Sequence, residues 1–135
     1  MYEQLQTALC YRFRDPSLLR NALTHSSYAN ENKSRNIICN ERLEFLGDSI
    51  LGFVVAEALY RRFPDRPEGE MTRMRADMVC EAALARAADT VGLGRELLLG
   101  HGEDLGGGRA RASILADAME SVIAAFEKTR ELGRK

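Results

Sequence analysis

The sequence has no tryptophan, and it has only three prolines and three cysteines in 135 residues. Cys10, Cys39 and Cys80 are odd in number and lack C-x-x-C spacing, so we expect free thiols in a reducing, cytoplasmic compartment. No run approaches the roughly 20 apolar residues that span a bilayer, and the first residues do not resemble a signal peptide. A disulfide scaffold and a membrane partner are therefore not expected.

The chain also lacks an excess of either charge. Lysine and arginine total 19 against 20 aspartates and glutamates, for a net charge of −1. There is no overall basic field of the kind that drives simple electrostatic binding to nucleic acid, although acidic catalytic residues would lower the total of any metal-dependent nuclease. Hydrophobic content of 45% is ordinary for a globular protein, so we expect one domain over residues 1–135.

Alternating β-branched runs are almost absent, while Ala, Leu, Glu and Arg are frequent, which predicts an all-α fold. Between Ile50 and Leu59 the only polar side chain is Glu57, a pattern that predicts a place at the centre of a helical bundle. We expect a polar connection at 28–36, with room for one helical turn, and a mobile glycine-rich loop at 101–109. The predicted helices cover residues 3–9, 17–23 (behind Asp15 and Pro16), 41–62 (with Asn40 as N-cap), 71–91 (after the segment 68–70), and 112–128 with Phe126 facing inward.

The segment 40–49 (NERLEFLGDS) carries three carboxylates along one side of a helix. At about 100° per residue, Glu41, Glu44 and Asp48 fall within roughly 60° of one another. Glu41 alone needs no metal, because an acidic residue in a first turn complements the helix dipole. Asp48 lies two turns in, where the helix becomes apolar and an unpaired charge is costly. The stripe therefore favours a hard cation such as Mg²⁺.

Asp117 and Glu120 repeat this acidic spacing at i and i+3 on the last predicted helix. One such pair is weak evidence, but two acidic faces that meet across a bundle form a metal cage. Neither histidine has the E-x-x-H spacing of a di-iron site, so oxygen ligands for Mg²⁺ or Mn²⁺ are expected.

Other residues suggest contacts with partners. Phe45 projects about 40° from the acidic stripe, beside the charges, which makes it an interface candidate. Glu68 precedes the third long helix, where an ordinary first-turn glutamate is an equally good explanation. Arg73 and Arg75 could bind phosphate, but a solvated helix face explains them as well.

Together these segments resemble the catalytic domain of bacterial ribonuclease III over essentially the whole chain. The ten-residue stretch 40–49 is highly specific to this family. The matching stretches occur in the family's order and are 22–31 (ALTHSSYANE), 40–51, 67–75 (PEGEMTRMR), 107–109 (GGR) and 113–117 (SILAD).

The resemblance implies an all-α ribonuclease III endonuclease bundle, a symmetric homodimer and cleavage of double-stranded RNA with Mg²⁺, for which Mn²⁺ could substitute. The substrates would be rRNA or mRNA precursors, recognised by their A-form shape, and the products would carry 5′-phosphate and 3′-hydroxyl ends. Phe45 matches the family's side chain that enters a socket on the other subunit. The metal-site carboxylates would be Glu44, Asp48, Asp117 and Glu120, with Asp48 and Glu120 catalytic and Glu41 and Glu68 in support or RNA handling. With a net charge of −1, phosphate contacts would come from few basic residues, for which the candidates are Arg73, Arg75, Arg109 and Arg111.

Three alternatives remain open at this stage. Family enzymes usually carry a double-stranded-RNA-binding domain, which this sequence lacks; we favour a truncated or split gene product over a minimal Mini-III-like enzyme. An all-α nucleotide pyrophosphatase would need denser acidic motifs, and a degenerate ribonuclease III fold used as a scaffold would have lost its carboxylates. The sequence does not decide between one and two metals per site.

Overall fold

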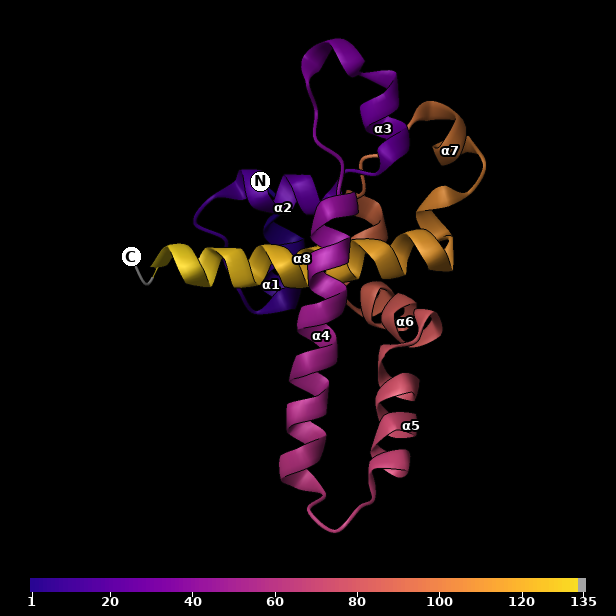
Figure 1. The fold of residues 1–135 in the computed structure, drawn as a ribbon. Coiled ribbons are helices and arrows are strands. Elements are labelled where there is room, and N and C mark those ends of the chain that lie inside the picture. The colour runs from indigo at the N-terminus through magenta and orange to yellow at the C-terminus, as the bar shows by residue number, and fades with distance from the viewer. Residues whose placement is uncertain (134–135) are drawn as a thin grey trace.

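Helix α8 (Ala112–Gly133) is the central element of the fold. In the computed structural model, which describes residues 1–133, it crosses α4 (Glu41–Arg62), as Figure 1 shows. Ala118, Ala124 and Ala125 on α8 are completely buried, and such small side chains let neighbouring helices approach closely. The remaining α-helices are α1 (Glu3–Leu9), α2 (Pro16–Leu23), α3 (Ser26–Glu31), α5 (Glu68–Val79), α6 (Glu81–Val91) and α7 (His101–Leu105).

The all-α architecture expected from the sequence is confirmed. Residues 134–135 of the expected domain lie outside the described residues. Among residues 1–133, no helix combines the length and apolar composition needed to cross a bilayer. A single parallel bridge between Thr24 and Leu98 joins the segment after α2 to the segment before α7.

Helices α4 and α8 meet at Gly47. A Cβ atom built on Gly47 would lie 2.5 Å from the carbonyl carbon of Glu120 and 3.2 Å from its Cα, so only glycine permits this crossing. Ser121, the next residue on α8, adds a hydrogen bond at this crossing. Its hydroxyl lies 3.2 Å from the carbonyl oxygen of Asn40 and 2.9 Å from the carbonyl oxygen of Asp117. The first turns of α4 are thus held directly against the middle of α8.

Asn40 stands at the N-cap of α4, but its side chain does not cap the helix. Its Nδ2 instead donates to the carbonyl of Ala22 at 3.0 Å, and its backbone N–H donates to the carbonyl of Thr24 at 2.8 Å. The predicted N-cap position is confirmed, but the side chain makes no capping hydrogen bond because this buried amide anchors α4 to the end of α2.

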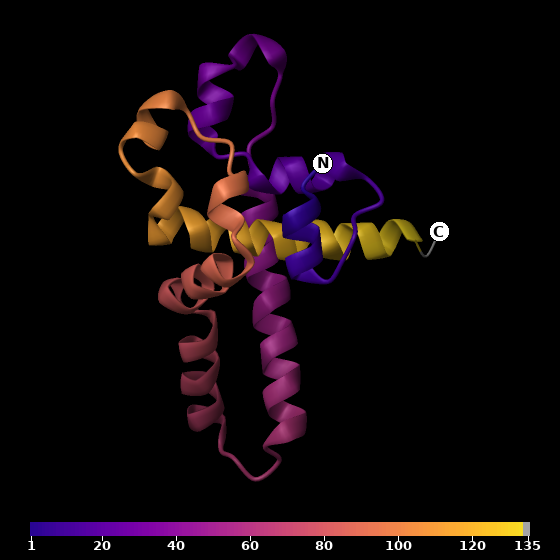
Figure 2. The same cartoon turned by 180° about the vertical axis from the view of Figure 1, so that it is seen from behind.

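The second half of α4 and all of α5 form an arm that extends away from α8, as both views show (Figures 1 and 2). Val55 and Leu59 are buried, but Phe53 and Tyr60 are 67% and 73% exposed, and no residue of α5 is buried. The prediction that this part of α4 lies at the centre of a bundle is therefore wrong within one chain.

Several connections also differ from the prediction. The helix expected after residues 68–70 begins at Glu68 and breaks at Cys80, which is extended (φ −68°, ψ 161°), so it becomes α5 and α6. The expected polar connection overlaps α3, where one helical turn was expected, and also contains a 3-10 turn (Lys33–Arg35). The expected mobile loop contains α7 and overlaps a 3-10 turn (Gly108–Ala110). Phe126, expected to face inward, is 36% exposed and packs edge-on against Tyr11, with ring centroids 4.6 Å apart.

Candidate metal centre

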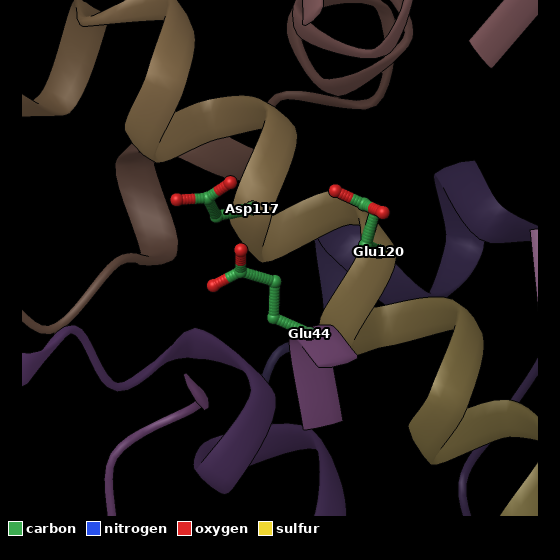
Figure 3. Close-up of side chains that lie close together, drawn as sticks. All are labelled: Glu44, Asp117 and Glu120. Carbon is green, nitrogen blue, oxygen red and sulfur yellow. The ribbon is translucent and has the colours of Figure 1, made fainter. Parts of the chain in front are cut away.

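Three carboxylates converge where the start of α4 crosses α8. Glu44 comes from the first turn of α4, and Asp117 and Glu120 lie one turn apart on α8 (Figure 3). One carboxylate oxygen from each residue lies within 4.8 Å of the others. The three side chains are half-buried, so water screens their mutual repulsion incompletely.

This crowding perturbs the acidities of all three groups. Burial raises the pKa of Glu120 to about 8, and a hydrogen bond with Asp48 and the Asp48 charge add to it. Burial also raises the pKa of Glu44 to about 7, followed by the charge of Asp117. The pKa of Asp117 is raised by burial, although its hydrogen bond with Glu44 acts in the opposite direction. Without a cation, the cluster holds protons that an exposed carboxylate would have released.

Asp48 and Glu41 lie at the border of this cluster. Both side chains are exposed, and neither belongs to the group of three convergent carboxylates. Asp48 forms a hydrogen bond with Glu120, while the charge of Glu41 raises the pKa of Glu44. Three of the four expected metal ligands therefore converge, with Asp48 hydrogen bonded to one of them.

Two residues near the cluster were not predicted from the sequence. The charge of Glu81, the first residue of α6, contributes to the raised pKa of Asp117. Burial lowers the pKa of His25, against the opposing effect of the Asp117 and Glu41 charges. His25 stands within the matching stretch 22–31, but its sequence neighbours give no sign that it lies beside carboxylates from α4 and α8.

The donor set fits a small divalent cation. All convergent donors are carboxylate oxygens, the ligands that Mg²⁺ and Mn²⁺ prefer. Two ligands on opposite sides of Mg²⁺ lie about 4.2 Å apart, so a spread of 4.8 Å requires only a small adjustment of side chains. A divalent cation would also offset the cost of burying these charges and the repulsion between them.

Other predicted site residues lie elsewhere. Phe45 is 80% exposed on the surface of α4. Glu68 and Arg75 line an open groove of ≈ 430 Å³ between the two helices of the arm, and Arg73 is exposed on α5. Within one chain, the structure does not bring Glu68 to the three convergent carboxylates.

Arg109 and Arg111 differ in how they are held. The Arg109 guanidinium donates to the carbonyls of Gly94 (3.1 Å) and Leu97 (2.7 Å) and pairs with Asp104 at 3.0 Å, so it ties together the segment before α8. These contacts give Arg109 a structural role, and the expectation that it contacts RNA stays a prediction. Arg111 pairs with Glu103 at the surface, where an ion pair contributes little and can exchange for another anion.

Known proteins with a similar sequence are ribonucleases of one family. A model of the Ribonuclease-III-like family matches residues 15–130. The chain is 51% identical over 123 residues to Ribonuclease 3 of Desulforamulus reducens, covering 91% of the chain and 50% of that protein. It is 53% identical over 126 residues to Ribonuclease 3 of Oleidesulfovibrio alaskensis, covering 93% and 55%. The chain thus spans about half the length of these curated relatives.

Two solved structures resemble this fold closely, and both are nuclease domains of ribonuclease III from Campylobacter jejuni. One superposes with a TM-score of 0.88 at 39% identity, covering 96% of this chain and 86% of that one, and is described as flexible in a region involved in dimer formation. The other has a TM-score of 0.85 at 39% identity and covers 94% and 82%.

Proposed function

The chain belongs to the ribonuclease III family, and from this membership we propose that it is a metal-dependent endoribonuclease that hydrolyses double-stranded RNA. Its helical bundle is that of the family's nuclease domain. The observation that carries the proposal is the convergence of Glu44, Asp117 and Glu120 from two crossing helices. A scaffold protein that had lost catalysis would have no reason to keep this costly arrangement.

Mg²⁺ is the proposed cofactor, with Mn²⁺ as a substitute, held by Glu44, Asp117 and Glu120 together with Asp48. When bound, the cation activates water and neutralises charge on the phosphate and on the leaving oxygen. The hydrogen bond between Asp48 and Glu120 links the two carboxylates, which supports their proposed catalytic roles. Glu41, exposed beside Glu44, is proposed to help handle the RNA.

Hydrolysis in this scheme adds water across a phosphodiester bond. The bond between phosphorus and the 3′ oxygen breaks, so the products carry 5′-phosphate and 3′-hydroxyl ends. Proposed substrates are rRNA and mRNA precursors in the cytoplasm, which agrees with three unpaired cysteines. The proposed RNA contacts are the exposed Arg73, Arg75 and Arg111, with Glu68 acting from the arm.

We also propose that the enzyme is a symmetric homodimer with Phe45 at the interface. Phe45 is 80% exposed, a costly position for a large apolar side chain unless another surface covers it. Ser49, Gly52 and Ala56 follow within about 40° of it on α4, and such small side chains would allow a second copy to approach. A dimer would place two centres on one duplex, one for each strand.

The test is cleavage of a long RNA duplex by the pure chain with Mg²⁺, with Mn²⁺ and with EDTA. Cleavage should require the metal, and Glu120→Gln should reduce it by about 10²-fold or more because a charged ligand is lost. Glu127→Gln is the matched control, since Glu127 lies on the same helix and pairs with Arg130. Cleavage that persists in EDTA, or equal loss in both variants, would contradict the proposal.

A further inference from the structure

His25 is held in one orientation and one tautomer. It stands at the N-cap of α3, where its Nδ1 accepts the backbone N–H of Ser27 at 3.1 Å and lies 2.7 Å from the Ser27 hydroxyl. That hydroxyl oxygen already accepts the N–H of Gly100 at 2.8 Å, so its own hydrogen is available to His25 Nδ1. With Nδ1 accepting, the ring proton lies on Nε2.

The backbone around His25 is equally constrained. The N–H of His25 donates to the carbonyl of Leu98 at 3.0 Å, and the N–H of Leu98 donates to the carbonyl of Leu23 at 2.9 Å. A Cβ on Gly100 would meet the Ser27 carbonyl oxygen at 2.8 Å, so the segment from Leu98 to Gly100 and α3 are in close contact. Figures 1 and 2 both show α3 beside α7, which follows Gly100. The position of the ring is therefore set before any ligand binds.

His25 lies beside the start of α4. Thr24, the residue before it, accepts the backbone N–H of Asn40 at 2.8 Å, directly before Glu41. The charged groups that act on the ring are Asp117 from α8, Glu41 from α4 and Arg111 from the segment before α8. Within residues 1–133, Nε2 makes no hydrogen bond, and the ring is half-buried. A fixed N–H donor thus remains available beside carboxylates that would hold a cation and, through it, a phosphate.

We propose that His25 contacts the substrate, its Nε2–H donating to a backbone oxygen of the RNA strand bound at the acidic centre. This inference rests on the proposed function and extends it to a residue outside the six acidic positions. A neutral donor suits the location, because lysine or arginine there would pair with the carboxylates and compete with the metal. Ser27 is the positioning residue, acting through the orientation of the ring.

Two amide variants distinguish the role of Nδ1 from the role of Nε2. Asparagine places an oxygen near the Nδ1 position and can still cap Ser27, but it has no donor at the Nε2 position; glutamine places an amide near Nε2 and loses the cap. His25→Asn should therefore lower the maximal single-turnover rate on duplex RNA by about 10- to 100-fold. Its thermal midpoint and its Mn²⁺ affinity should match the wild type, and His25→Gln should recover part of the rate. Ser27→Ala should give an intermediate loss.

Modified duplexes identify the oxygen that is contacted. A 2′-deoxy nucleotide or a methylphosphonate at the scissile position removes one acceptor each, and the modification that removes the partner should abolish the difference between wild type and His25→Asn. Additive losses with both modifications would overturn the proposal. So would a His25→Asn rate within twofold of wild type, or a loss matched by reduced stability or Mn²⁺ affinity. An inactive wild type would overturn the proposed function as well, whereas an active wild type with an unaffected variant overturns only this inference.

Discussion

Gly47→Ala tests whether the helix crossing builds the metal centre. The added Cβ would lie 2.5 Å from the carbonyl carbon of Glu120, against an ordinary carbon–carbon contact of about 3.5–4.0 Å. The Cβ is fixed to the backbone of α4 and the atoms it meets are backbone atoms of α8, so no side-chain rotation can relieve the overlap. Helices α4 and α8 must separate by about 1 Å at the point between Glu44 and Asp48.

The magnitude follows from two opposing effects. Overpacking at such a contact costs about 1–3 kcal/mol, and replacing a helical glycine with alanine returns about 1 kcal/mol through helix propensity. We expect a net loss of about 1–2 kcal/mol of unfolding free energy, measured by urea denaturation. Activity should fall further, by about 10²-fold, because a displacement of about 1 Å separates the carboxylates of α4 from those of α8.

Gly69→Ala on α5 is the matched control, because it lies away from the surface around Phe45. No atom lies within 4 Å of a Cβ built on Gly69, so this change should stabilise the chain by up to about 1 kcal/mol and leave the metal centre unchanged. If Gly47→Ala is as stable and active as Gly69→Ala, the reasoning about the crossing is refuted.

Phe45→Asp should convert a dimer into a monomer in light scattering, because it removes a large apolar contact and adds a charge; a monomeric wild type would refute the interface. The raised pKa values of Glu44 (about 7) and Glu120 (about 8) mean that the folded, metal-free chain binds more protons than the unfolded chain above pH 4.5. Unfolding free energy without metal should therefore decrease from about pH 4.5 to pH 8, by on the order of 1–2 kcal/mol after solvent screening, and Mg²⁺ should flatten this profile; a flat metal-free profile would contradict it. Arg109→Ala should lower the thermal midpoint while Arg111→Ala should weaken RNA binding alone, in a salt-dependent way; equal stability of the two variants would remove the structural role of Arg109.

Local patterns in the sequence were sufficient for the long elements. The helix expected over 41–62 is observed as α4, because a 3.6-residue period and a following Phe-Pro pair act within one segment. The same period places Glu44 near Asp48, and Asp117 near Glu120. That the two acidic faces would meet was an inference about packing, and Gly47 is the residue in the sequence that permits it.

The two shortest α-helices were not predictable in this way. Helices α3 and α7 have six and five residues, too few for propensity to decide. Distant contacts hold them: the carboxylate of Glu31 accepts the N–H of His101 at 2.9 Å, and Ser27 accepts the N–H of Gly100. The position of the apolar second half of α4 was predicted wrongly for a related reason. Composition indicates that an apolar helix face needs a packing partner, but it does not identify that partner.

Side-chain roles depend on the same distant contacts. Arg73 and Arg109 look alike in the sequence, yet Arg109 is occupied by the carbonyls of Gly94 and Leu97 and by Asp104. The tautomer of His25 depends on the Ser27 hydroxyl, which accepts the N–H of Gly100, 73 positions further along the chain. A carboxylate can be predicted as a metal ligand from its own helix, because repulsion from a neighbouring carboxylate one turn away favours a bound cation. A neutral donor such as His25 has no such effect on its neighbours in the sequence, so its role can be inferred only from the folded structure.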